Sequence, residues 1–369
     1  MSNMHTQSPV SVPRKTLRFS VAAGVLGSAK LAVLIIGAVA MSCAQPQTLA
    51  LSAPQAFSHQ RTFPVVSRGY MLSFSRTITT ANASNVLVTS LTDGRGRQVP
   101  VSLPGSVSTV LLDGSVNESD HLILVGQTTS MSNSGDVLRT TGFVAEVDFQ
   151  GKVKSVVDTG KYTPARTCAS GDGTYWTLGA AMSNEGNAAL IAGDDTNMLR
   201  NYSPEGKLLH SYMPRSSFRA ASINLLPSGQ TFGATNTKVY LSCSSSSVGV
   251  YIGKPVNLWT EVRLGSGRGA QWRIRQLPGG TVTGLTHSLR GDVYASVDFA
   301  NETPGLYRLD LSAAKAIWVR LPTDTSAFSN LLGREGDSLV HLIGSRALAG
   351  AAIAQQTQPN PSLYKTAVP

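Results

Sequence analysis

The sequence carries little charge and none of the compact motifs that mark common catalytic sites. Only 14% of its 369 residues are charged, against about a quarter in an average globular protein. It has no HExxH, P-loop, GxSxG or CxxC motif, which excludes the usual signatures of zinc proteases, nucleotide phosphate loops and α/β-hydrolases. No cofactor, metal ligand or catalytic residue is therefore assigned from motifs.

The formal charge of +10 does not indicate a nucleic-acid partner. Residues 1–44 carry four basic and no acidic residues, so 27 basic and 21 acidic residues remain in the rest of the chain. They are scattered, with no basic run interleaved with aromatics. We expect no nucleic-acid binding.

The first 44 residues are typical of an export signal. Basic residues precede an 11-residue apolar stretch, residues 31–41 (LAVLIIGAVAM), and small residues follow at Ser42 and Ala44. That length suits a signal peptide better than a membrane span of about 20 residues. The alternative is an uncleaved anchor over residues 19–44, with Lys30 inside it. The sequence thus predicts an exported protein, periplasmic, cell-surface or extracellular, with membrane contact through this segment alone.

Cys43 is a candidate for lipidation. Residues 40–43 (AMSC) resemble the lipobox of bacterial lipoproteins, with a small residue before the cysteine. They differ from it by Ala40 three positions upstream. Cleaved signal, lipoprotein and uncleaved anchor all stay open. Beyond this segment we expect a linker over 45–69, a folded domain over 70–346 and a flexible tail over 347–369.

The rest of the chain reads as a series of hairpins of two recurring types. Period-two alternation broken by Gly and Asp predicts strands joined by tight turns. The larger type is predicted over 86–103, 143–158, 198–212, 258–277 and 306–321. The smaller, more apolar type is predicted over 108–127, 165–179, 221–234, 239–253, 282–298 and 329–343. The two types mostly alternate, as blades of four antiparallel strands would require.

Four short phrases carry a resemblance to a known class. They are residues 201–209 (NYSPEGKLL), 290–296 (RGDVYAS), 305–310 (GLYRLD) and 331–337 (LLGREGD). Over residues 85–345 the chain resembles exported bacterial β-propellers of the NHL/YVTN-like kind. The resemblance implies an all-β fold with a single β-propeller, and says nothing specific about activity. A β-sandwich is the alternative fold.

Ring closure follows from counting hairpins. The larger hairpin at 86–103 has no smaller partner before it, and the smaller hairpin at 329–343 has no larger partner after it. An unpaired sheet edge is an aggregation hazard. We therefore expect these two hairpins to share one sheet and to close a ring of six blades. In this count 221–234 is a blade of its own. Seven blades is the alternative, if residues 70–80 add a strand to a further sheet.

Four residues on the predicted inner strands are the candidates for a site at the mouth of the central channel: Asp113, Asn224, His287 and Asn330. Propeller lactonases hold calcium there with acidic and amide side chains. This sequence shows no matching motif, so a metal role is not carried over.

Cys168 and Cys243 fall on predicted innermost strands of blades that are not neighbours, because 221–234 is counted as a blade between them. Their Cα atoms should then exceed the roughly 7 Å that a disulfide can span. We expect two free, buried thiols.

The function favoured by the sequence is non-enzymatic binding of a protein or glycan by the loops on one face. The alternative is a metal-dependent hydrolase of lactonase type at the channel mouth. An enzyme should bring several Asp, Glu, Asn or His side chains together with perturbed pKa values. A binding protein should show an apolar or aromatic patch on one face.

Overall fold

The computed structural model describes residues 47–49, 64–74, 84–131, 138–181, 199–212, 238–244, 247–253, 259–265, 272–288, 290–298, 305–312, 315–321, 328–344 and 362–368. All regular structure in these ranges is β-strand. No helix in this part of the chain is long and apolar enough to cross a membrane.

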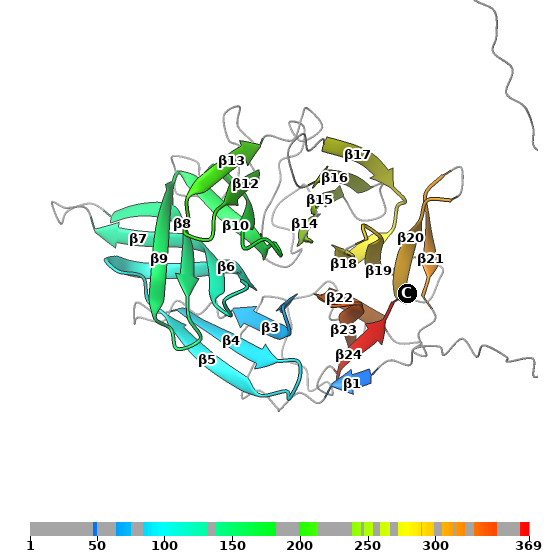
Figure 1. Cartoon of the computed structure of the whole chain (residues 1–369), viewed down its shortest axis with the longest axis horizontal. Coiled ribbons are helices and arrows are strands. Elements are labelled where there is room, and N and C mark those ends of the chain that lie inside the picture. The colour runs from blue at the N-terminus through cyan, green and yellow to red at the C-terminus, as the bar shows by residue number, and fades with distance from the viewer. Residues whose placement is uncertain are drawn as a thin grey trace, which may run out of the picture. The chain divides into compact units, whose positions relative to one another are not determined.

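Within these ranges, six four-stranded antiparallel sheets follow one another along the chain (Figure 1). The first three are built from consecutive strands. The first sheet contains β2 (Val65–Ser67), β3 (Tyr70–Phe74), β4 (Ser84–Ser90) and β5 (Gly96–Val101). The second contains β6 (Ser106–Val116), β7 (Leu122–Met131), β8 (Leu138–Val147) and β9 (Val153–Gly160). The third contains β10 (Tyr162–Ala169), β11 (Tyr175–Ala181), β12 (Leu199–Tyr202) and β13 (Leu208–Tyr212).

The other three sheets complete the domain, and the last of them combines both ends of the described chain. The fourth contains β14 (Lys238–Cys243), β15 (Ser247–Gly253), β16 (Trp259–Gly265) and β17 (Trp272–Leu277). The fifth contains β18 (Thr281–His287), β19 (Val293–Asp298), β20 (Gly305–Asp310) and β21 (Ile317–Arg320). The sixth contains β22 (Phe328–Glu335), β23 (Ser338–Gly344), β24 (Ser362–Ala367) and β1 (Gln47–Leu49).

One five-residue turn recurs between strands and explains the local repeat. Its first residue donates its N–H to the carbonyl of the fifth, as in Asp148 to Lys152 and Ser203 to Lys207. The fourth residue has a positive φ, which favours glycine; Gly151 and Gly206 occupy this position with φ of 88° and 84°. In the turn that starts at Asn117, Asp120 takes that place with φ of 55°. A small polar first residue and a later glycine are thus what each tight turn requires.

The first strand of every sheet contacts the first strand of the next sheet. These contacts run β2–β6, β6–β10, β10–β14, β14–β18 and β18–β22, and β22 in turn contacts β2. The first strands are therefore the inner ones, and β5, β9, β13, β17 and β21 lie at the outer edges of their sheets. The fold is a β-propeller.

Buried apolar clusters fill the spaces between consecutive sheets. Leu72 and Phe74 of the first sheet pack with Leu111 and Leu124 of the second. Other clusters join the second sheet to the third, the fourth to the fifth, the fifth to the sixth and the sixth to the first. The core thus lies between blades, as the stacking of sheets around a centre requires.

The predicted hairpins that fall on described residues coincide with paired strands, but the predicted closure is wrong. Residues 86–103 belong to β4–β5 in the first sheet, whereas 329–343 belong to β22–β23 in the sixth. The predicted composite sheet is therefore two sheets. Each is completed by short strands at the ends of the chain: β2–β3 in one, and β24 with β1 in the other. Three-residue strands such as β1 and β2 are too short to show a periodicity.

The predicted domain bounds of 70–346 were too narrow for the same reason. β1 and β2 lie in the predicted linker, and β24 lies in the predicted tail. β24 shows no period-two alternation of buried and exposed residues, and Ala- and Gln-rich sequence precedes it, so the sequence does not predict this strand. Predicted hairpin 221–234 lies outside the described residues.

Candidate functional site

Asp113 is buried on the inner strand β6, directly after a β-bulge between Leu111 and Asp113. Its Oδ2 accepts the backbone N–H of Thr167 on β10 at 2.9 Å. Burial raises the pKa of Asp113 to about 6, although the guanidinium of Arg166 and backbone N–H groups oppose the rise. The carboxyl is thus held between two inner strands, and its charge changes near neutral pH.

Arg166 is the charged neighbour of Asp113 and is itself buried on β10. Its Nη1 donates to the carbonyl of Ala165 at 2.8 Å. Burial lowers the pKa of Arg166, and Asp113 opposes that effect. A buried carboxyl and a buried guanidinium therefore lie close to each other at the junction of the second and third sheets.

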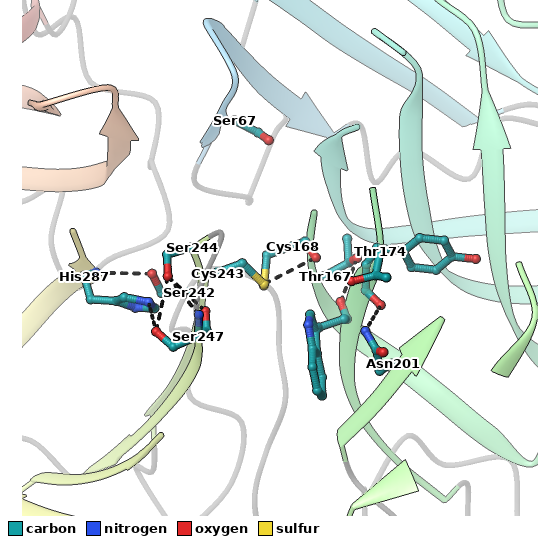
Figure 2. The surroundings of a disulfide bond; sticks show 12 residues. Ser67, Thr167, Cys168, Thr174, Asn201, Ser242, Cys243, Ser244, Ser247 and His287 are labelled. Carbon is teal, nitrogen blue, oxygen red and sulfur yellow. Dashed lines mark hydrogen bonds between the residues drawn. A yellow bond between two sulfur atoms is a disulfide. The ribbon is translucent and has the colours of Figure 1, made fainter. Parts of the chain in front are cut away.

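His287 ends the inner strand β18 and is fully buried. Its Nε2 lies 3.2 Å from Ser247 Oγ, and its backbone N–H donates to Ser242 Oγ at 3.2 Å (Figure 2). Burial lowers its pKa to about 3, helped by the positive charges of Arg263 and Arg334. The ring is therefore neutral at physiological pH, and its Nδ1 has no hydrogen-bond partner among the described atoms.

Three of the four predicted channel residues lie in the described structure, each on a different sheet. Asp113 lies in the second sheet and His287 in the fifth. Asn330 lies on β22, paired in register with Leu342. Asn224 lies outside the described residues, as does Cys43. Within the described ranges, no group of three or more His, Cys, Asp or Glu side chains is arranged to hold a metal ion.

What Asp113 and His287 share is a position at the junction between consecutive inner strands. At the first junction, Val116 on β6 donates its N–H to Ser67 Oγ on β2 at 3.0 Å. Three more junctions repeat the arrangement: Asp113 with Thr167, Ser242 with His287, and Ser296 of β19 with Leu331 of β22. In each pair a side chain of one sheet accepts a backbone N–H of the next. Periodicity could not find these pairs, because the partners lie 35–54 residues apart.

The junction between β10 and β14 is made by a disulfide, so the prediction of two free thiols is wrong. The sulfur atoms of Cys168 and Cys243 are bonded, and their Cα atoms lie 5.7 Å apart. Figure 2 shows the bond between the two strands, beside the Ser242–His287 group. The prediction failed because it counted 221–234 as a blade between these strands, whereas β10 and β14 are in contact.

A second charged group, which the sequence reading missed, lies on the fourth sheet. Glu261 on β16 is buried, with 2% of its side chain exposed, and forms ion pairs with Arg263 and Arg275. Arg263 also donates to the carbonyl of Gly291 in the fifth sheet at 2.8 Å. Alternation of charges along β16 and β17 was the available signal. The group ties the fourth sheet to the fifth.

No protein family matches the chain, and no curated protein matches its sequence. Solved structures share its fold at low identity. A gluconolactonase from Xanthomonas campestris is 13% identical, with a TM-score of 0.43 over 88% of this chain and 90% of its own. A protein of unknown function from Dyadobacter fermentans is 10% identical, with a TM-score of 0.45 over 88% and 98%. The β-propeller domain of the trilobed protease from Pyrococcus furiosus is 9% identical, with a TM-score of 0.41 over 82% and 78%. At these values the likeness carries no argument about activity.

Proposed function

We propose that the chain is an exported six-bladed propeller whose rigid ring presents its turns to a protein or glycan partner. One observation carries this proposal: the series of side chain–backbone bonds and the disulfide that join consecutive sheets. Asp113 and Ser242 accept two of these backbone N–H groups with their side-chain oxygen atoms. A ring fixed in this way is a scaffold on which exposed turns can hold a binding geometry.

Six blades and a closed ring are part of the proposal. β1 pairs with β24 in register, Gln47 opposite Lys365 and Leu49 opposite Leu363. An early segment thereby completes the last sheet as its outer strand. Such pairing supports closure because it ties distant parts of the chain into one blade.

Export is also part of the proposal, and the disulfide supports it. Disulfides persist in oxidising compartments and are rare in the cytosol. Together with the apolar segment at 31–41, this favours a place in the periplasm, on the cell surface or outside the cell. Cys43 would be lipidated, or residues 1–44 would be removed or kept as an anchor, so the membrane is contacted through that segment alone.

The binding proposal is tested with purified full-length protein on arrays of glycans and cell-envelope proteins. We expect saturable binding that falls when exposed turn residues Asp172, Glu205 and Lys207 are replaced by alanine. Replacement of Lys154 on the outer strand β9 is the matched control and should leave binding unchanged. Absence of saturable binding, or equal loss in the control, would contradict the proposal.

A hydrolase is the second candidate, favoured by the pKa of about 6 for Asp113 beside the guanidinium of Arg166. A carboxyl that titrates near neutral pH can act as a general base, and a neighbouring cation can stabilise a carboxylate product. Gluconolactone is the first substrate to try, because it is a simple lactone and the alternative function is a hydrolase of lactonase type.

This candidate is tested by following acid release from gluconolactone with and without calcium. A hydrolase should lose at least about 100-fold in rate on Asp113→Asn, the usual contribution of a general base. The exposed turn variant Asp172→Asn is the control. Rates at the uncatalysed level for the wild type exclude this activity and leave the binding proposal standing.

A further inference from the structure

The outer strand of the fifth sheet, β21, has a free edge. It is last in the strand order of that sheet, and among the described residues it pairs with β20 alone (Figure 1). Directly after it, Leu321 donates its backbone N–H to the carbonyl of Leu306 on β20. Because backbone groups alternate in direction along a strand, the N–H and C=O groups of Trp318 and Arg320 point away from β20. Such a row of backbone groups is a template on which another strand can pair.

The side chains of β21 form an apolar stripe on one face of the sheet. Trp318 lies on the other face, where it packs in the cluster of the fourth and fifth sheets and donates its indole N–H to the carbonyl of Pro278 at 3.2 Å. Ile317, Val319 and Leu321 therefore share the opposite face. Leu321 is buried there in the cluster that the fifth sheet shares with the sixth, whereas Ile317 and Val319 are 46% and 37% exposed. The stripe thus runs from a buried junction to the outer edge.

Basic side chains flank this stripe. Lys315 precedes β21, Arg320 ends it and Arg308 lies on β20. The ion pairs formed among the described residues involve none of these three. The β20–β21 hairpin contains a single acidic residue, Asp310, which accepts the backbone N–H of Ser312. The hairpin therefore carries a net positive charge that is available to a partner.

The edges of three other outer strands are less suited to pairing. β5 contains Pro100, and β9 exposes Val156 between charged neighbours such as Lys154. β13 exposes Leu208 and Leu209, but a register shift interrupts its ladder at this point. Proline, charged residues and bulges all hinder edge-to-edge pairing. β21 has no proline and no register shift, and its charge favours a partner strand of opposite sign.

We propose that β21 is a docking edge for an acidic peptide segment of a partner protein, which joins the fifth sheet as a further strand. Backbone hydrogen bonds to Trp318 and Arg320 supply the pairing. Apolar side chains at alternate positions of the segment cover Ile317 and Val319, and the carboxylates between them meet the positive charges of Arg320 and Lys315. This edge is separate from the exposed turns of the binding proposal, so the two stand or fall independently.

The first experiment measures binding of a synthetic peptide of about six residues, the usual length of a strand, in which valine and glutamate alternate. Fluorescence anisotropy with the full-length protein should show saturable binding that weakens as salt is raised. The matched peptide with lysine in place of glutamate should bind at least about tenfold more weakly. Equal binding of the two peptides, or no saturable binding of the acidic one, would overturn the proposal.

Two variants of Arg320 separate charge from backbone pairing. Arg320→Ala removes the charge alone and should weaken binding of the acidic peptide by about threefold. Arg320→Pro also removes the outward N–H and should abolish binding, while the bonds to β20 remain. Thermal melting of both variants checks that they are folded. If the folded proline variant binds as well as the alanine variant, no strand pairs at this edge and the proposal is wrong.

The apolar stripe is tested separately, so the proposal stays falsifiable if Arg320→Pro does not fold. Val319→Thr keeps the shape of the side chain and should weaken binding about fivefold, because less apolar surface is covered. Leu208→Thr on the outer strand β13 is the matched control and should leave binding unchanged. Sedimentation of the wild type identifies the other possible occupant. A dimer that Val319→Thr dissociates, with no peptide binding, would show that a second copy of the chain covers β21, contrary to the proposal.

Discussion

At the scale of single residues, we expect the carboxyl of Asp113 to make stability depend on pH between 3.8 and about 6. Its pKa in the folded protein is raised by burial to about 6, above the ordinary 3.8. The folded state therefore binds a proton more readily than the unfolded chain between these two values. Because of this, the contribution of Asp113 to stability is largest below pH 3.8 and is lost as the pH rises to about 6.

We therefore expect the difference in unfolding free energy between wild type and Asp113→Asn to depend on pH. The wild type should lose roughly 3 kcal/mol relative to the variant between pH 4 and 7, since two pKa units correspond to that amount. Urea unfolding at four pH values measures it. A difference that stays constant with pH would show that the carboxyl does not titrate in this range.

His287 has the opposite effect over the acidic range. Burial lowers its pKa to about 3, below the ordinary 6.5, so the unfolded chain binds the proton first. Stability from the neutral ring is present above pH 6.5 and is lost as the pH falls toward 3. Relative to His287→Gln, the wild type should lose about 2 kcal/mol between pH 6.5 and 5. Thermal unfolding of both proteins across that range would reveal an equal pH dependence if His287 were solvated.

Asp113 and His287 also show which contacts cannot be predicted from the sequence. Asp113 and His287 stand out in sequence as polar groups in apolar strands, which was enough to single them out. Their partners could not be found, because Thr167 lies 54 residues from Asp113 and Ser242 lies 45 residues from His287. Such pairs depend on which strands become neighbours, and that information is absent from local patterns.

At the scale of elements, turns and hairpins were predictable, whereas bulges and close approaches were not. The turn from Asp148 to Lys152 could be predicted because its first residue and its glycine each meet a local requirement. Opposite the bulge in β6, Gly126 of β7 lies where a Cβ atom would be 2.0 Å from the carbonyl oxygen of Val110. The need for glycine comes from the carbonyl group of the neighbouring strand, so the sequence around Gly126 does not indicate it.

Gly126→Ala should destabilise the protein by about 1–3 kcal/mol, because a backbone carbonyl must move to admit the methyl group. Gly96→Ala on the outer strand β5 is the matched control, since its Cβ would meet nothing nearer than 3.4 Å. That substitution should be neutral, or stabilising by up to about 1 kcal/mol. Denaturant midpoints compare the two, and similar values for both would rule out the steric account of Gly126.

At the scale of the whole molecule, all-β architecture and blade repetition followed from sequence, but the manner of closure did not. Counting hairpins places 86–103 and 329–343 in one sheet, because the sequence does not predict the strands β2 and β24. β24 is separated from β23 by 17 residues. The structure instead pairs β1 with β24, which makes three early residues the outer strand of the last sheet.

This pairing predicts a sharp boundary in N-terminal truncations. Removing residues 1–44 leaves β1 and should leave the melting temperature unchanged, whereas removing 1–50 deletes it. The second truncation exposes the backbone groups of β24 along an open edge, and loss of about 1 kcal/mol would lower melting by roughly 2–4 °C. Hydrogen exchange should rise in β24 and hardly at all in β13, the outer strand of the third sheet. If both truncations melt alike and β24 stays equally protected, β1 does not stabilise the sixth sheet, and β24 is its outer strand in solution.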